Sequence, residues 1–209
     1  MRKPNFMVAI SAAMLVSILF IGNMAGTAAT VPSTVELPDK LPKAEPPVVV
    51  TTLGQSPGAL MVRMLCNSVK LKCDEKDLLT AEELLAASKK KDTAYKTLII
   101  TMGTSLKGMG AAGIDIESEV KRVQAVIDTA RKLGILIIGA QIEGPSRRVD
   151  EYDEKSIRTV TPQSDLLIIR KDINKDGYFS NTAKEKHIPI VFITQAMDLT
   201  HVLKVLFSL

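Results

Sequence analysis

The sequence contains no tryptophan, and only 4% of its 209 residues are aromatic. Single-stranded nucleic acids are held largely by stacking of bases on aromatic side chains, so this composition supplies few stacking platforms. The formal net charge is +4, and Arg2 and Lys3 supply two of these charges, which leaves +2 (4 − 2) on residues 30–209. A nearly balanced chain lacks the electrostatic footprint of a polyanion-binding protein. We therefore expect no nucleic-acid partner.

The sequence has only two histidines, and a serine nucleophile would need one of them as its general base. Residues 54–58 read G-x-S-x-G between a predicted strand and a predicted helix, which is the context of a nucleophile elbow around Ser56. Pro57 has no N–H to donate to an oxyanion. His187 precedes a predicted strand, and His201 falls inside the last predicted helix. These placements disfavour a serine hydrolase, and we predict that Ser56 caps the following helix instead.

The only two cysteines are Cys66 and Cys73, and their spacing matches no reliable metal-ligand pattern. In an exported protein they would meet an oxidising compartment and could form a disulfide. Two buried thiols explain the same residues equally well. The sequence leaves both alternatives open.

The N-terminus has the three parts of a secretory signal. Arg2 and Lys3 precede an uncharged apolar run, Met7–Ile21, and small residues then allow cleavage after Ala29. We predict a signal peptide over residues 1–29, a proline-rich extended linker over 30–47 and one α/β domain over 48–209. The predicted location is periplasmic or extracellular. The alternative is an uncleaved N-terminal helix that anchors the chain, and we expect membrane contact only through this signal or anchor.

Five continuous runs rich in valine and isoleucine recur along the domain, and each is typical of a strand buried on both faces of a parallel sheet. A sixth run, residues 68–73, alternates apolar and polar side chains and is predicted to be an edge strand. Helical patterns separate the runs, so right-handed crossovers are expected. The sequence predicts a doubly wound, Rossmann-like or flavodoxin-like, mostly parallel sheet with strand order 2-1-3-4-5-6. The five runs are residues 48–52, 97–102, 135–140, 165–170 and 189–194.

Ligands of such sheets bind outside the carboxyl ends of the strands, at the point where the strand order reverses. Here that point lies between the loops that follow the first and third strands. The helix that begins near Ser56 has no acidic residue close by, so its free N–H groups around Ser56–Ala59 predict an anion site. The predicted ligand-binding residues are Gly54, Gln55, Ser56, Gly103, Thr104, Ser105, Lys107, Gly108, Glu143, Arg147, Arg148, Lys171 and Asn174.

Two motifs resemble cofactor or metal sites without meeting their requirements. Residues 108–113 match G-x-G-x-x-G, but they follow a later strand, and three carboxylates crowd the next helix start, where they would repel phosphate. We expect residues 103–113 to form a small-residue loop that lets backbones pack closely. Residues 172–177 resemble half of a calcium loop, yet Ala183 stands where a bidentate glutamate belongs. We predict a polar turn there, no metal site, and no identified cofactor.

Four segments together carry a resemblance: GQSPGAL, GTSLKGMGAAGID, QIEGPSRR and NKDGYF, with a signal in front. The chain resembles a family of exported bacterial α/β proteins known only as a domain of unknown function, over about residues 48–207. The resemblance implies export and a Rossmann-like sheet, and it carries over no catalytic residue.

The sequence therefore predicts an exported α/β domain of unknown function that binds a small anionic or polar molecule at the carboxyl ends of the strands. One alternative is an enzyme that acts on a small metabolite at the same site. Another is an envelope-associated module that binds a protein partner. No reaction can be named from the sequence, so whether the chain is an enzyme stays open.

Overall fold

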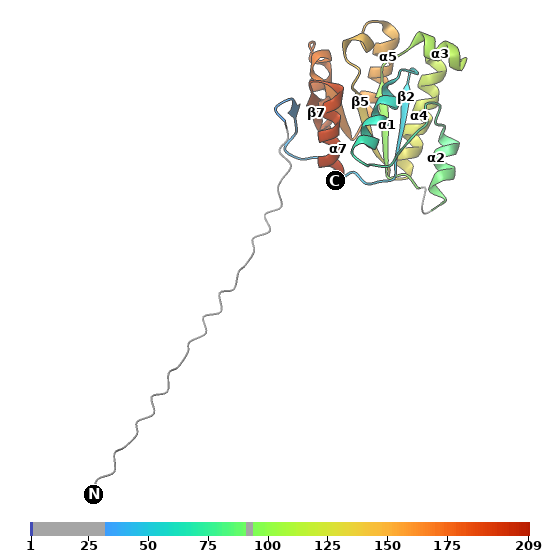
Figure 1. Cartoon of the computed structure of the whole chain (residues 1–209). Helices are drawn as coiled ribbons and strands as arrows, with labels where there is room; N and C mark the ends of the chain where they lie inside the picture. Colours follow the sequence, from blue (N-terminus) through green and yellow to red (C-terminus); the bar gives the residue numbers. More distant parts are fainter. Residues whose placement is uncertain (2–31, 91–93) are drawn as a thin grey trace.

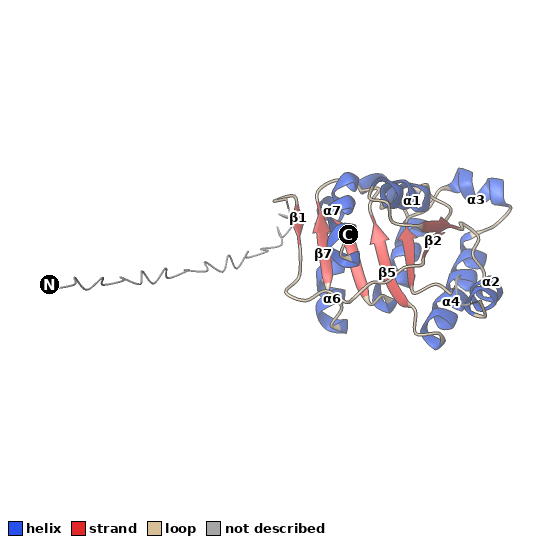
Figure 2. Cartoon of the chain, turned by 60° about the horizontal axis from the view of Figure 1, so that its bottom comes forward, coloured by secondary structure: helices blue, strands red, loops and turns tan. Residues whose placement is uncertain are grey.

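The computed structural model describes Met1, residues 32–90 and residues 94–209, and it shows a seven-stranded sheet between two layers of helices (Figures 1 and 2). The strand order is β1-β7-β6-β5-β4-β2-β3. All described pairs are parallel except β1 with β7. The strands are β1 Val35–Glu36, β2 Val48–Leu53, β3 Cys73–Glu75, β4 Thr97–Met102, β5 Leu136–Gln141, β6 Leu166–Arg170 and β7 Ile190–Ile193.

The predicted doubly wound sheet is confirmed. The order 2-1-3-4-5-6 corresponds to β3-β2-β4-β5-β6-β7, and β1 adds one antiparallel strand at the far edge. Every residue of β2 and β4 is buried, as the continuous apolar runs indicated, because helices cover both faces of the sheet. The helices are α1 Gly58–Ser68, α2 Ala81–Ser88, α3 Leu106–Ala112, α4 Ile116–Lys132, α5 Glu151–Val160, α6 Tyr178–Lys186 and α7 Leu199–Phe207.

The core lies in two clusters, one on each face of the sheet. Alternate residues of β4 separate between them: Ile99 joins the cluster under α1 and α7, and Leu98 joins the cluster under α2, α4, α5 and α6. Figure 1 shows α1 and α7 together on one side of the strands. Burial of both clusters fixes the register of the sheet, because a shift of one residue would exchange the two faces.

Helices α2 and α4 each begin with a side-chain cap. Thr80 and Glu83 form a reciprocal capping box on α2, and the Asp115 carboxylate accepts from Ser118 N on α4. Both caps satisfy backbone N–H groups that a helix start leaves without intrahelical partners.

The sixth predicted strand, residues 68–73, was placed too early. Helix α1 continues to Ser68, and Lys70 then adopts a left-handed φ of 61° before β3 begins at Cys73. The apolar positions that suggested a strand include Leu71, which is buried against α1 while its N–H closes the helix end on Cys66 O. The edge position of the strand is confirmed, since β3 pairs only with β2 among the described strands.

The predicted glycine-rich loop over residues 103–113 contains a helix, α3. Ser105 caps α3 by accepting from Gly108 N, and Gly113 ends it with a left-handed φ of 64°. Position 108 of this helix requires glycine, because its backbone packs on the neighbouring loop. An added Cβ there would lie 2.2 Å from Gln55 O. The close backbone packing expected of these small residues is therefore present, although the loop itself is mostly helical.

Part of the segment predicted as a linker lies along the domain. Val35 and Glu36 pair with Ile193 and Phe192 of β7. Glu45 exchanges two hydrogen bonds with Thr97 at the start of the central strand β4. Residues 2–31, which include nearly all of the predicted signal, lie outside the described residues. Within the described part, no helix is long and apolar enough to cross a membrane.

Candidate functional site

The loops that follow β2 and β4 meet at the carboxyl ends of these neighbouring strands, as the strand order predicts. Ser105 N donates to Gly54 O at 2.8 Å, and Gln55 and Thr104 form an isolated antiparallel bridge. Gly54 has φ of 110°, and an added Cβ would lie 2.5 Å from Thr104 Cγ2. This close approach requires glycine and brings together five predicted site residues: Gly54, Gln55, Gly103, Thr104 and Ser105.

Ser56 does not cap helix α1, which corrects the sequence prediction. The helix begins at Gly58 after Pro57, and no side-chain cap is present. The Ser56 hydroxyl instead donates to Glu143 Oε1 at 2.6 Å, and Arg147 Nε donates to Glu143 Oε2 at 3.1 Å. An added Cβ on Gly58 would lie 2.7 Å from Glu143 Oε1, so this carboxylate lies directly at the helix start. The chain's own carboxylate thus occupies the place where the sequence suggested a ligand anion.

Two buried carboxylates that the sequence analysis missed hold the same loops. Glu119 is fully buried on α4 and accepts from Gly54 N at 2.8 Å and from Gln55 Nε2 at 3.0 Å. Asp153 on α5 accepts from Thr104 N at 2.7 Å and from Thr104 Oγ1 at 2.8 Å. In each helix a buried apolar residue follows the acid by four positions, so the two side chains share the inner face. This spacing was the sequence signal that could have identified both acids as buried.

Three other predicted site residues, Arg148, Lys171 and Asn174, bind groups of the chain itself. Arg148 pairs with Glu154 and Asp176, each at 2.7 Å, and its hydrogen bonds to Asp176 hold the pKa of that carboxyl below its usual range. Lys171 forms an ion pair with Glu36, the last residue of β1. Asn174 accepts from Phe179 N at 3.0 Å and so supports the start of α6. Residues 172–177 therefore form a polar turn, as predicted.

A cavity of about 310 Å³ lies between the α3 start and the loop that leads into α5. Lys107 of α3 and Arg147 of the segment before α5 line it, together with Ser105, Ser146, Asp150 and Asp153. Arg147 is fixed by Glu143 and by a 2.8 Å bond to Thr104 O. Lys107 is exposed and has no ion pair among the residues that the structure describes. The cavity thus presents two cations and the carboxylates of Asp150 and Asp153, and Lys107 forms an ion pair with neither in the described structure.

Residues 45–207 match the family described as a domain of unknown function, DUF6305. The match covers more than half of the chain. The chain belongs to the DUF6305 family. This agrees with the resemblance drawn from the sequence, which also pointed to a family of unknown function. No curated protein matches the sequence.

Several solved structures are distantly similar to this DUF6305 domain. A psychrotrophic esterase, EstA from Pseudoalteromonas sp., is 8% identical with a TM-score of 0.34, over 70% of this chain and 76% of the esterase. A GDSL-like lipase from Bacteroides thetaiotaomicron is 12% identical with a TM-score of 0.34, over 68% and 66%. A CheY-like protein, TadZ from Pseudomonas aeruginosa PAO1, is 16% identical with a TM-score of 0.34, over 76% and 98%. No activity follows from similarities this weak, and the fold assignment rests on the strand order.

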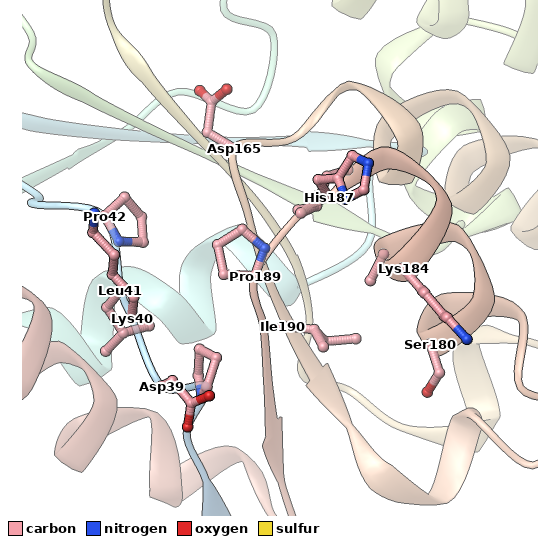
Figure 3. Close-up of a pocket in the computed structure, with 13 residues that line it drawn as sticks. Asp39, Lys40, Leu41, Pro42, Asp165, Ser180, Lys184, His187, Pro189 and Ile190 are labelled. Atoms are coloured by element: carbon pink, nitrogen blue, oxygen red, sulfur yellow. The ribbon is translucent and has the colours of Figure 1, made fainter.

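Neither histidine of the DUF6305 domain hydrogen-bonds to Ser56 in the described structure, where the Ser56 hydroxyl donates to Glu143. His201 is exposed on α7, and His187 ends α6 with a left-handed φ of 56°. His187 lines a shallow groove of about 790 Å³ with the segment 38–42 and with Pro189, which precedes β7, and Figure 3 shows these side chains around it. This groove is at the amino ends of β6 and β7, opposite the loops described above. The positions of both histidines agree with the sequence prediction.

The described residues also contain no cluster of three or more histidine, cysteine, aspartate or glutamate side chains that could hold a metal ion. The carboxylates at the carboxyl edge instead bind the chain's own N–H groups and arginines.

Proposed function

We propose that this DUF6305 domain binds a small anionic or polar molecule at the carboxyl ends of β2 and β4, in the cavity between residues 104–107 and 146–153. One observation carries the proposal: Lys107, which lacks an ion pair among the described residues, faces the same cavity as the anchored Arg147. Two cations, one on α3 and one in the segment before α5, can clamp one carboxylate or phosphate group.

The surrounding contacts support a preformed site. The loop donors Gly54 N and Thr104 N are already bound by Glu119 and Asp153, which fixes the loop backbones. A guanidinium has five N–H donors, and Arg147 uses Nε and Nη1 within the chain, so further donors can bind a ligand. A rigid site of this kind loses little conformational entropy on binding.

The position of Glu143 refines where the ligand's negative charge would lie. An anion placed on the N–H groups of Ser56–Ala59 would meet the Glu143 carboxylate, which already lies at that helix start. We therefore place the anionic group between Lys107 and Arg147. Ser105, Ser146 and Asp150 then face the polar remainder of the molecule.

A thermal-shift screen of small carboxylates and phosphates tests the site. A specific ligand at about 100 times its dissociation constant should stabilise the domain by about 2.7 kcal/mol, or about 5–10 °C in Tm. Lys107→Ala should remove most of this shift and leave the Tm of the unliganded protein unchanged, because Lys107 makes no ion pair in the described structure.

Lys204→Ala is the matched control, since Lys204 is also an exposed helical lysine without a described ion pair, but lies on α7. It should retain the full shift. If no compound raises the Tm, or if the shift survives in Lys107→Ala, the proposed site is wrong.

The enzyme alternative would place a reaction in the same cavity. Glu143 is the carboxylate near these loops that could act as an acid or base, but Ser56 and Arg147 engage both of its oxygens. Ser56 lacks a histidine partner among the described residues. The geometry therefore favours binding. The alternative, a module that binds a protein partner, would use the open groove lined by residues 38–42 and 187–190 instead of the carboxyl edge.

We also propose that the chain is exported. The charged, apolar and small-residue segments of the N-terminus support this proposal. Mass spectrometry of the protein recovered from cells should find an N-terminus near Thr30. Full-length protein retained in the membrane fraction would instead support the uncleaved anchor and reject cleavage.

A further inference from the structure

The only two cysteines of the chain are brought together at one edge of the sheet. Cys66 lies in the last turn of α1, and Cys73 is the first residue of β3, which pairs with β2 beneath that helix. Both are free thiols, and both belong to the same core cluster, with exposed fractions of 0% and 7%. The seven-residue separation in sequence thus becomes a direct neighbourhood in the fold.

The chain reversal between them is tightly built. Val69 N and Leu71 N both donate to Cys66 O, and Lys70 takes a left-handed φ of 61° between them. This turn directs Cys73 back toward the end of α1. The hydrogen bond that the structure gives the Cys73 thiol is to Asp74 O at 4.0 Å, and Cys73 is near enough to lower the pKa of the Cys66 thiol. The turn therefore places both buried thiols in one core cluster at the edge of the sheet.

We propose that Cys66 and Cys73 form an intramolecular disulfide that locks the end of α1 to the edge strand β3. The oxidant is a second disulfide, such as glutathione disulfide or the active-site disulfide of a thiol oxidoreductase. The Cys66 thiolate attacks one oxidant sulfur and displaces a thiolate, which forms a mixed disulfide. The Cys73 thiol then loses its proton and attacks the Cys66 sulfur, and the second oxidant thiolate leaves. Two protein thiols are oxidised, and one oxidant disulfide is reduced to two thiols.

The location on the sheet gives an oxidant a route to these buried sulfurs. Strand β3 has only three residues and lies at the edge of the sheet, so it can open locally without disruption of the central strands. The bond would close a short loop, residues 66–73, and would limit this same opening. Oxidation would thereby stabilise an edge strand that pairs with only one neighbour among the described strands.

Intact-mass measurement of disulfide formation tests the proposal. The full chain is purified with reductant and equilibrated with mixtures of reduced and oxidised glutathione, once folded and once unfolded in urea. The folded protein should lose two hydrogens, with an equilibrium constant at least tenfold above that of the unfolded chain, because the fold already holds both cysteines in one core cluster. A tenfold ratio corresponds to about 1.4 kcal/mol of added stability, and the oxidised protein should show a higher Tm.

Cys66→Ala and Cys73→Ala are the controls. Neither variant can lose two hydrogens within one chain, and each can only form a mixed disulfide with glutathione. The proposal is overturned if the folded protein keeps both thiols in a glutathione mixture that oxidises the unfolded chain. It is equally overturned if oxidation yields disulfide-linked dimers, or if the folded and unfolded constants are equal.

Discussion

Replacement of Ile99 by aspartate should unfold the domain. Ile99 is 1% exposed in β4, between Val50 of β2 and Ile138 of β5, and its side chain lies in the core cluster under α1. A carboxylate there has no cation to pair with in that apolar cluster, and burial of an unpaired charge costs several kcal/mol. Since domains are stable by only about 5–15 kcal/mol, most of the folded population should be lost. Far-ultraviolet circular dichroism and urea unfolding measure the outcome.

Lys72→Asp is the matched control, because Lys72 is exposed in the turn before β3. Its free energy of unfolding should change by no more than about 0.5 kcal/mol. Equal tolerance of aspartate at both positions would contradict the placement of β4 in the centre of the sheet.

Arg122→Ala should destabilise the domain by about 3–5 kcal/mol, because it leaves a buried carboxylate without its cation. Arg122 pairs with Glu119, whose side chain is 0% exposed, at 2.8 Å. The same guanidinium donates to Thr52 O and Leu79 O, so it joins α4 to β2 and to the chain before α2. Urea unfolding at neutral pH measures the loss.

Two further variants make this test specific. Arg131→Ala removes an arginine from the same helix, but its partner Asp165 is 34% exposed, so the loss should be about 0–1 kcal/mol. Glu119→Gln added to Arg122→Ala removes the uncompensated charge and should recover part of the stability. Equal losses for the two arginine variants, or no recovery in the double variant, would contradict a buried ion pair at the base of the loops.

The sheet and its helices were predictable because their signals are local. The runs rich in valine and isoleucine predicted β2 and β4, and the helical patterns between the runs predicted helices such as α2 and α4. The strand order followed because parallel strands with intervening helices allow few topologies. The boundaries of β3 were wrong since the alternating residues 68–73 end a helix and turn back before the strand begins.

The candidate site was only partly predictable because its contacts join distant parts of the chain. Ser56 and Glu143 are 87 positions apart, and Thr104 and Asp153 are 49 apart. Topology placed their loops on one edge, but no sequence spacing indicated that Glu143 would lie at the start of α1. Whether Arg148 would face a ligand or pair with Glu154 and Asp176 also depends on side-chain packing between loops. Sequence patterns therefore located the edge and left its internal pairings undetermined.

Amide chemical-shift mapping tests the ligand-binding proposal most directly. Residues 30–209, labelled with nitrogen-15, are titrated with the small-molecule fraction of a cell extract. A ligand clamped by Lys107 and Arg147 should shift amides of residues 104–107 and 146–150, and Lys107→Ala should abolish these shifts while Lys204→Ala retains them. Shifts confined to the groove formed by residues 38–42 and 187–190, or no shifts at the carboxyl edge, would contradict the proposed site.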